Sequence, residues 1–483
     1  MNLARICSNV CHPIIIALIA TINLSLLTGC GALVRVSHQS WQTFRNSELF
    51  WYGRHGPLDD TERQWANVAW RYIKNNTDSQ TGLINSQDQW PIISMANIGH
   101  GLAALHSAYQ LKLIDDLIFD KALSKQLHFL NIMPLLNEQL PNRFYHTETG
   151  EMISNVNGQP GAAGWSGQEL GQLLIWLNLF KRYYPAYAEY IDKAILRWDF
   201  CKLISPNGDI LDGQLEHGMT ATNFNIKNNS RLGTRQYAAY GYQLWGFDVY
   251  KSEKMLPLQE FKIYQVSFGV DGHDPRIDDI PNPLLTTPFF MSGILFNWDS
   301  AAQLKPSNNE LHHHSASQLA LQSRALYQLQ EARFTQEGIH TARAAHVGEQ
   351  GHLPLYDAIW ALGSPFPPTI TSDGKFLPKS ALVSTQATFL MWALWKTAYT
   401  DELMLLIEPL YHEQKGWFEG RYEHSGGYQQ RLSLATNSTV LSALLYKDTG
   451  PLVQSLNTPS HLTLRRMNEF KHPEKCHPKK QVN

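Results

Sequence analysis

The sequence lacks a strong net charge, and it has few cysteines. Its 483 residues carry a formal net charge of −2, and only 5 of them are cysteine. A nearly balanced charge argues against nucleic acid, or an anionic membrane surface, as an electrostatic partner. The cysteines form no CxxC pair and no zinc-binding spacing. We therefore expect neither a nucleic-acid partner nor a zinc site.

Signature motifs of several enzyme classes are also missing. The chain contains no HExxH, no phosphate-binding P-loop and no dinucleotide fingerprint. GWSGQ, residues 164–168, departs from the G-x-S-x-G nucleophile elbow at Gln168, and no predicted strand precedes it. The run His312-His313-His314 would point its side chains about 100° apart on a helix, which suits a polar helix start better than a metal site. We expect no cofactor, no metal and no serine-hydrolase centre.

An apolar run lies at the N-terminus and is too short to cross a bilayer comfortably. It covers residues 14–27, follows Arg5 and leads into LTGC at 27–30. This tetrad resembles the lipobox of bacterial lipoproteins, which implies cleavage before Cys30 and lipidation of its thiol. Gly31 follows in place of an aspartate, which by the lipoprotein rule favours the outer membrane. The alternative is an uncleaved anchor.

The domain plan follows from this signal and from local composition. We expect a signal peptide at 1–29, a tether at 30–60, a folded domain at 61–450 and a polar, disordered tail at 451–483. The protein would then be an outer-membrane lipoprotein of a bacterial cell envelope that faces the periplasm. Cys201 and Cys476 would remain in that oxidising compartment, where a disulfide between them is an open question.

The expected folded domain is a succession of helices with few convincing strands. Apolar periodicity predicts helices over 61–76, 93–111, 116–134, 166–183, 186–202, 234–247, 284–297, 312–336, 381–398, 400–412 and 435–447. Segment 61–76 is amphipathic, whereas 166–180 and 381–395 are apolar nearly all round, which indicates burial on all sides. This alternation of half-exposed and fully buried helices predicts two concentric helical rings.

Seven strings, in order within 77–447, resemble the bacterial domain-of-unknown-function family 3131. They are TDSQTGLINSQDQWP, GWSGQELGQLL, RWDFCKL, RLGTRQYAAYGYQLWGFDV, FNWD, GWFEGRYE and ATNSTVLSALLYK. The resemblance implies an all-α fold, an α/α toroid of about six helical hairpins related to glucoamylase-like domains and bacterial β-glucanases. It also implies a glycan ligand, since the family often accompanies exopolysaccharide genes. It does not establish catalysis, because the site and not the fold decides the function.

Glycoside hydrolysis usually needs two carboxyl groups, one to protonate the leaving oxygen and one to activate water or attack the sugar. Glu169 is the first candidate, because it lies near the start of a buried helix with Trp165 four residues before it. A carboxyl group beside an indole in an apolar setting can keep a raised pKa and act as the acid. Ser166 and Glu169 also fit the S-x-x-E capping box, so a structural role stays open.

Two aspartates are candidates for the second carboxylate. Asp88 precedes the predicted helix 93–111 and lies near Trp90, and the resembled family usually keeps an acid there. The alternative for Asp88 is a loop aspartate that satisfies turn amides. Asp357 lies in a long loop ahead of an aromatic residue.

Further substrate contacts are predicted around GWFEGRYE. Glu419 and Glu423 are candidate substrate-binding acids, and their alternative is a solvated loop position. The candidate sugar-stacking or sugar-contacting side chains are Trp90, Trp165, Arg235, Tyr237, Trp417 and Tyr422.

The chain departs from the family pattern where acids are common. Those positions hold Asn97, Arg235, Thr287 and Ser442 here, so four rim carboxylates would be missing. A fixed cation at Arg235 indicates a shift towards an anionic glycan, a loss of catalysis, or simple pairing with a neighbouring acid. A polysaccharide lyase that uses Arg235, Tyr237 and His217 is conceivable, although no spacing singles it out.

The leading hypothesis is a lipid-anchored periplasmic protein that binds an exopolysaccharide or periplasmic glucan. Hydrolysis of that glycan is the candidate activity. Glu169 would be the acid, with Asp88 or Asp357 as the base. The alternative is a non-catalytic glycan-binding lipoprotein that assists polysaccharide assembly or export, which the missing acids favour. A third hypothesis is a structural envelope protein without a glycan ligand.

Overall fold

The computed structural model describes residues 53–155, 157–215, 224–227, 231–255, 258–272, 283–298, 317–349 and 351–453. They fall within the unit Gly53–Asn483. Several predictions lie outside the described residues: the signal peptide, Cys30, His217, the run His312-His313-His314 and Cys476. Of the helices that can be described, none has both the length and the apolar character needed to span a bilayer.

Six helices form a closed inner ring, in which each helix packs against the next and the last packs against the first. They are α4 (Met95–Gln110), α6 (Gly167–Tyr183), α8 (Thr234–Leu244), α11 (Thr287–Phe296), α13 (Thr385–Leu394) and α15 (Leu434–Thr449). Helix α13 is buried along its whole length and α6 along most of it, as their apolar sequences predict. Helices α6 and α8 approach so closely that a Cβ on Gly241 would lie 1.8 Å from the carbonyl oxygen of Gly171.

A second set of helices packs against the outside of this ring. It comprises α3 (Asp60–Asn76), α5 (Asp116–Ile132), α7 (Ala188–Ile195), the single turn α9 (Tyr250–Glu253), α12 (Gln318–Glu337) and α14 (Ala398–Ile407). Helix α3 is amphipathic as predicted, because Trp65 and Val68 are buried while Arg63 and Lys74 are exposed. The prediction for 186–202 is too long, since 3₁₀ turns at Pro185–Tyr187 and Phe200–Lys202 flank α7.

The prediction of an all-α fold is wrong, because the described chain also contains eight small antiparallel sheets. The three-stranded sheets are β1 (Ile92–Ser94) with β4 (Phe144–His146) and β5 (Met152–Ile153), β6 (Gly164–Ser166) with β7 (Asp212–Leu215) and β8 (Phe224–Lys227), and β17 (Leu382–Ser384) with β20 (Gly420–Tyr422) and β21 (Tyr428–Gln429). A four-stranded sheet joins β11 (Ala345–Val347), β12 (Pro354–Tyr356), β15 (Thr369–Thr371) and β16 (Phe376–Leu377).

The remaining sheets are two-stranded ribbons. They pair β2 (Leu135–Leu136) with β3 (Leu140–Pro141), β9 (Leu258–Ile263) with β10 (Val266–Asp271), β13 (Trp360–Ala361) with β14 (Ser364–Pro365), and β18 (Tyr411–His412) with β19 (Gly416–Trp417). Most of these strands have only two or three residues. Alternation of apolar and polar residues needs about four to eight residues to be recognised, so the sequence pattern missed them.

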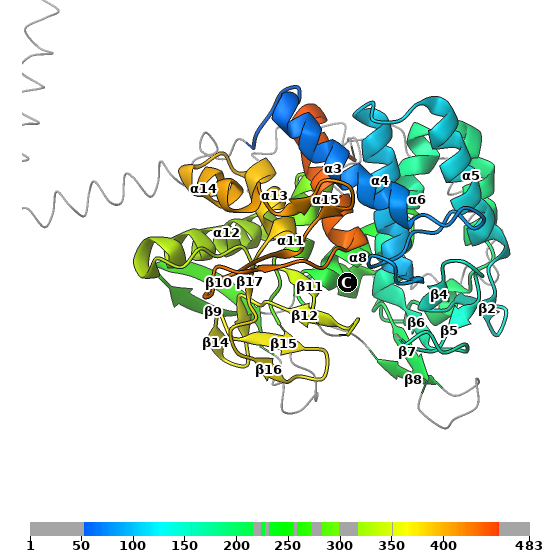
Figure 1. Ribbon diagram of the computed structural model, residues 1–483. Helices are drawn as coiled ribbons and strands as arrows, with labels where there is room; N and C mark the ends of the chain where they lie inside the picture. The colour runs from blue at the N-terminus through cyan, green and yellow to red at the C-terminus, as the bar shows by residue number, and fades with distance from the viewer. Residues whose placement is uncertain are drawn as a thin grey trace, which may run out of the picture. The chain divides into compact units, whose positions relative to one another are not determined.

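The strands lie in the connections that lead from an outer helix to the next inner helix. The inner helices therefore all begin at the same end of the ring, which we call the strand-bearing rim. Figure 1 shows this rim in the lower part of the view, where the labelled strands gather below the helices. Long loops and helix N-termini thus converge at one end of the ring, and such loops on a rigid scaffold are where binding residues concentrate.

Serine caps start four of the six inner helices. The side chains of Ser94, Ser166, Ser384 and Ser433 each accept a hydrogen bond, 3.2 to 3.4 Å long, from the amide three residues further on. Ser94, Ser166 and Ser384 also end a rim strand. One residue therefore terminates the strand and satisfies a free helix amide, which fixes where each inner helix begins.

Candidate functional site

Glu169 lies at the strand-bearing rim, in the first turn of α6. Its amide donates to Ser166 Oγ at 3.3 Å, but its carboxylate does not return to Ser166 as a full capping box would. Oε1 instead accepts a hydrogen bond from Arg143 Nε at 2.8 Å, and Oε2 accepts one from the Ala96 amide at 3.4 Å. Glu169 thereby links the first turns of α6 and α4, and its side chain keeps 14% exposure.

A second carboxylate, that of Asp212, lies at the same helix end and was not predicted. The pairing of β6 with β7 sets Asp212 opposite Ser166. Asp212 Oδ1 accepts hydrogen bonds from Ser166 Oγ at 3.0 Å and from the Gln168 amide at 3.5 Å. Strand β6 covers Gly164–Ser166, the first three residues of GWSGQ, so a strand does lead into Ser166, contrary to the expectation from the sequence. Gln168 still breaks the nucleophile-elbow motif.

Arg143 connects the two carboxylates electrostatically. The charge of Glu169 foremost, and then that of Asp212, raises the pKa of Arg143, whose side chain keeps 48% exposure. Tyr356 of β12 also interacts with Arg143, and its ring lies 5.4 Å from the guanidinium carbon of Arg231. The cluster Glu169, Arg143, Asp212 and Tyr356 therefore combines two acids, a cation and an aromatic ring at one point of the rim; we call it the α6-mouth cluster.

His100 borders the α6-mouth cluster on α4. Its Nδ1 lies 3.0 Å from Asn97 Oδ1, so Asn97 pairs with a histidine where the family pattern favours an acid. Burial lowers the pKa of His100 to about 4, against the opposing charge of Glu169. The ring is therefore neutral at pH 7, and it adds a polar but uncharged group beside Glu169.

Asp88 and Trp90 lie in another loop of the rim. Asp88 Oδ2 is 3.1 Å from Lys415 Nζ, and Oδ1 accepts a hydrogen bond from Asn76 Nδ2 at 3.3 Å. One face of Trp90 stacks on His352, with ring centroids 4.2 Å apart and planes 1° from parallel. Asp88 keeps 21% exposure but shares no described contact with Glu169.

Asp357, the other candidate base, is fully buried. It accepts hydrogen bonds from Thr369 Oγ1 at 2.6 Å and from the Leu382 amide at 2.8 Å, and its Oδ2 lies 3.1 Å from His346 Nε2. Burial opposes ionisation, but His346, followed by Arg343 and Thr369, outweighs it and lowers the pKa of Asp357. Both carboxylate oxygens of Asp357 therefore accept hydrogen bonds from within the protein, which indicates a structural role. This placement disfavours contact with a substrate.

The two glutamates of GWFEGRYE are also committed to internal partners, not solvated as the alternative interpretation expects. Glu419 accepts hydrogen bonds from Ser433 Oγ at 2.6 Å, Thr436 Oγ1 at 2.8 Å and the Val347 amide at 3.1 Å. Arg343 holds both carboxylate oxygens of Glu423, at 2.8 and 2.9 Å, and Arg333 adds a contact at 3.1 Å. These contacts tie the rim loops to α15 and α12.

Most of the predicted aromatic contacts lie in the core. Trp417 is fully buried and donates to the Trp65 carbonyl at 3.1 Å, and Trp165 packs edge-on against Phe224 at 4.9 Å. Tyr237 is buried, which raises its pKa. Tyr422 is half-buried and donates to Glu349 Oε1 at 2.5 Å.

Two further predicted rim positions are internal. Burial lowers the pKa of Arg235, whose Nη2 donates to the Lys254 carbonyl at 2.9 Å, so this cation binds backbone oxygen inside the protein. Ser442 lies in the middle of α15 and donates to the Ser438 carbonyl at 3.0 Å, so an acid there would not face the rim. Thr287 is the first residue of α11, although the helix was predicted to begin at residue 284.

The described residues line two cavities away from the α6-mouth cluster. One, of about 340 Å³, is bordered by β17, β20 and α14 and includes Arg421 and Glu423. The other, of about 600 Å³, lies at the opposite end of the ring, where Arg54 and Trp392 meet the start of α3. No group of three histidine, cysteine, aspartate or glutamate side chains suited to a metal ion occurs in the described part of the chain.

The double ring with a strand-bearing rim is the fold of glucoamylase-like proteins. A glucoamylase-like protein from Bacteroides caccae matches with a TM-score of 0.58 and 11% identity, over 85% of this chain and 98% of its own. An endo-β-1,2-glucanase from Chitinophaga pinensis, solved with sophorotriose and glucose, matches with a TM-score of 0.55 and 10% identity, over 86% and 99%. A β-1,2-glucanase from Parabacteroides distasonis matches with a TM-score of 0.56 and 10% identity, over 87% and 60%.

The sequence itself identifies the family. The model of the protein family of unknown function DUF3131 matches residues 64–450, and the chain belongs to this family. The resemblance found from the sequence strings is thereby confirmed. No curated protein matches the chain significantly.

Proposed function

We propose that this protein binds a β-linked glucan at the strand-bearing rim and hydrolyses it through Glu169 and Asp212. The observation that carries the proposal is the placement of both carboxylates at the mouth of α6, where both interact electrostatically with Arg143. Paired carboxyl groups are what glycoside hydrolysis requires. The fold shared with the Chitinophaga pinensis endo-β-1,2-glucanase supports a glucan as the substrate class.

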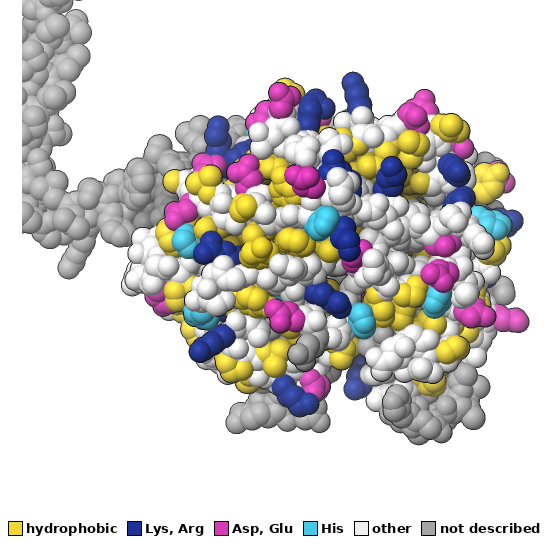
Figure 2. Space-filling view, viewed as in Figure 1, with side chains coloured by type: hydrophobic (Ala, Val, Ile, Leu, Met, Phe, Trp, Pro, Cys, Tyr) yellow, Lys and Arg dark blue, Asp and Glu magenta, His cyan; other side chains and the backbone are white. Residues whose placement is uncertain are grey.

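The residues around the cluster supply the other parts of a sugar site. Tyr356 offers a half-buried ring with an apolar face and a polar tip, and His100 and Asn97 offer uncharged hydrogen-bonding groups. Figure 2 shows cationic and anionic side chains interspersed over the visible face, which fits a neutral polymer better than a strongly charged one. Asp212 replaces Asp88 and Asp357 as the partner acid, because it contacts the same helix mouth as Glu169.

Turnover by single-residue variants tests the proposal. The full chain would be incubated with β-1,2-glucan, cellulose and amino-sugar polymers, and products would be read by mass spectrometry. We expect Glu169→Gln and Asp212→Asn each to lower turnover by about 10²-fold or more while oligosaccharide binding persists. Glu148→Gln, which alters an exposed glutamate elsewhere, is the matched control and should retain full activity. Unchanged turnover in Glu169→Gln would refute the assignment.

A non-catalytic glycan-binding protein for polysaccharide assembly or export is the second candidate. It is favoured by the internal commitment of Asp357, Glu419 and Glu423, which leaves fewer accessible acids than the sequence suggests. This function predicts saturable glucan binding without any released oligosaccharide in the same panel.

We also propose that the protein is held at the bacterial outer membrane by a lipid on Cys30. The support is the apolar run at 14–27 followed by LTGC at 27–30. The periplasm is then where the strand-bearing rim would meet an exopolysaccharide or a periplasmic glucan.

A further inference from the structure

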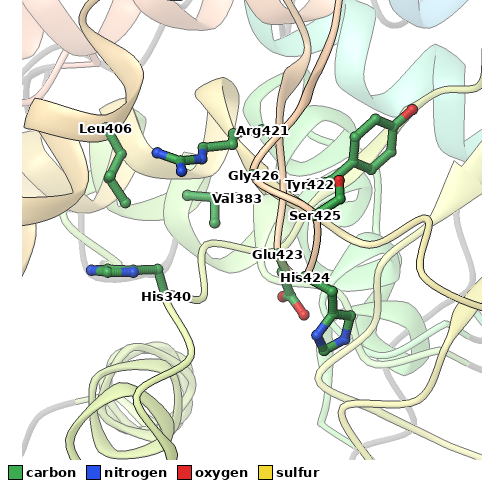
Figure 3. A pocket seen from close by; sticks show the side chains of 9 residues that line it. All are labelled: His340, Val383, Leu406, Arg421, Tyr422, Glu423, His424, Ser425 and Gly426. Atoms are coloured by element: carbon green, nitrogen blue, oxygen red, sulfur yellow. The ribbon is translucent and has the colours of Figure 1, made fainter.

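The smaller of the two cavities described above lies apart from the α6-mouth cluster. Its volume is about 340 Å³, and its lining includes Arg421, His340, His424, Ser425, Val383 and Leu406. Volumes of about 300–1,000 Å³ are typical of small-molecule sites. In Figure 3, Arg421 and His340 extend to the same side, with Leu406 next to the guanidinium, whereas Tyr422 turns the other way.

Strand geometry explains why Arg421 reaches this cavity. In β20, Arg421 pairs with Val383 of β17, and its neighbour Tyr422 turns its hydroxyl to Glu349. Successive side chains of a strand point to opposite faces, so Arg421 is directed away from the Tyr422 side. Gly426 leaves room for the guanidinium, because a Cβ there would lie 3.0 Å from Arg421 Nη2.

The charge of Arg421 is unmatched within the described structure. Its guanidinium makes no hydrogen bond or ion pair with another described residue. The acid of the lining, Glu423, is already held by Arg343 and Arg333. Arg333 also pairs with Glu337 at 3.6 Å, so these four side chains balance in charge and Glu423 is not free to pair with Arg421. His340 is engaged through Nε2 with Glu402 at 2.8 Å. The cavity therefore presents one free cation whose five donors suit a planar anion.

The rest of the lining indicates what carries the anion. Val383 and Leu406 form an apolar side near Arg421, while Ser425 and His424, which lie toward the Tyr422 side in Figure 3, supply polar groups for sugar hydroxyls across the cavity. A bare inorganic anion would fill only the Arg421 end, whereas a pyranose with a carboxylate uses the cation, the apolar side and the polar groups together. We propose that this cavity binds a hexuronate, with the sugar carboxylate held by Arg421 in a bidentate pair.

Ligand titrations of the full chain test this proposal. Isothermal titration calorimetry would compare D-glucuronate, D-glucose, acetate and inorganic phosphate. We expect D-glucuronate to bind at least tenfold more tightly than the other three, because only it has both the carboxylate and the sugar ring. Arg421→Ala should weaken D-glucuronate binding at least tenfold. Arg421→Lys should restore only part of it, since lysine keeps the charge but loses the planar fork.

Controls separate this site from the α6-mouth cluster. Arg63→Ala removes an exposed cation on α3 and should leave D-glucuronate binding unchanged. Glu169→Gln should also leave D-glucuronate binding unchanged. The hexuronate proposal can therefore hold even if the glucan proposal fails. The hexuronate proposal is overturned if D-glucose, acetate or phosphate binds as tightly as D-glucuronate or more tightly. It is also overturned if Arg421→Ala, unfolding at the wild-type temperature, binds D-glucuronate as the wild type does.

Discussion

At the residue scale, five carboxylates of the strand-bearing rim fall into two environments. Asp357, Glu419 and Glu423 are buried and fully hydrogen-bonded, and their partners come from rim loops and inner helices. Glu169 and Asp212 instead lie at a helix mouth, where the partly positive N-terminus favours an anion. Only the second environment leaves a carboxylate within reach of a ligand, which is why we assign the chemistry to it.

Histidine burial predicts acid sensitivity. His106 is almost fully buried, with Nδ1 2.9 Å from Tyr184 Oη, and burial lowers its pKa from 6.5 to about 3. Between these two values the unfolded chain binds a proton that the folded chain does not. The free energy of unfolding should therefore fall by about 1.4 kcal/mol for each pH unit below 6.5 from this group alone.

Urea unfolding at pH 7 and pH 5 measures this dependence. Between pH 7 and pH 5, we expect the free energy of unfolding of His106→Gln to fall by roughly 2 kcal/mol less than that of the wild type. This difference holds whatever the stability of the variant at pH 7. His128→Gln, at an exposed position of α5, should keep the wild-type dependence. Identical pH dependence in His106→Gln and the wild type would contradict the account.

At the element scale, the inner helices α6 and α8 meet in direct backbone contact. Gly171 and Gly241 bring α6 and α8 together, and serine caps set where the inner helices begin. Both features place the first turn of α6, and with it Glu169, at a fixed point of the rim. Packing of the inner helices is thus a condition for the geometry of the site.

Gly241→Ala tests the contact between α6 and α8. The new methyl group would overlap the Gly171 carbonyl, and overpacking of this kind costs about 1–3 kcal/mol. We expect a net loss of about 2 kcal/mol, seen as a lower urea midpoint, despite the better helix propensity of alanine. Gly272→Ala, where nothing lies within 4 Å of the new group, is the control and should unfold like the wild type. Equal midpoints for Gly241→Ala and the wild type would count against the close contact.

The sequence predicted elements better than it predicted the site. Apolar periodicity located the helices, and S-x-x-E marked the start of α6, because both signals are local. Asp212 carries no local signal, since it reaches Ser166 only through the pairing of β6 with β7. Trp417 was misjudged for a related reason: an aromatic residue beside a glutamate looks the same in a sequence whether it faces solvent or packs on Trp65.

At the scale of the whole molecule, the two ends of the ring differ. The strand-bearing rim collects the long connections and the N-termini of the inner helices, whereas the described chain begins at Gly53 near the opposite end, where Arg54 binds the Trp395 carbonyl at 3.0 Å. The lipid proposed on Cys30 would attach the chain N-terminal to this domain.

Cys30→Ser tests that attachment. We expect the variant to move from the membrane fraction to the soluble periplasmic fraction, because a serine cannot take the thioether-linked lipid. Immunoblots of the fractions and intact mass spectrometry of the wild type provide the readout. Cys11→Ser, which removes a cysteine but leaves LTGC at 27–30 intact, is the matched control. Membrane retention of Cys30→Ser, without a mass increase in the wild type, would exclude the lipid anchor.

The most direct test of the central claim is hydrogen–deuterium exchange of the full chain with and without sophorotriose. Amides that a bound ligand covers or rigidifies exchange more slowly. We expect protection concentrated at the α6-mouth cluster, in peptides that cover 143–146, 164–169 and 212–215, and none around Arg54 and Trp392. Protection confined to the Arg54 end, or no protection at saturating sugar, would contradict the placement of a glucan site at the strand-bearing rim.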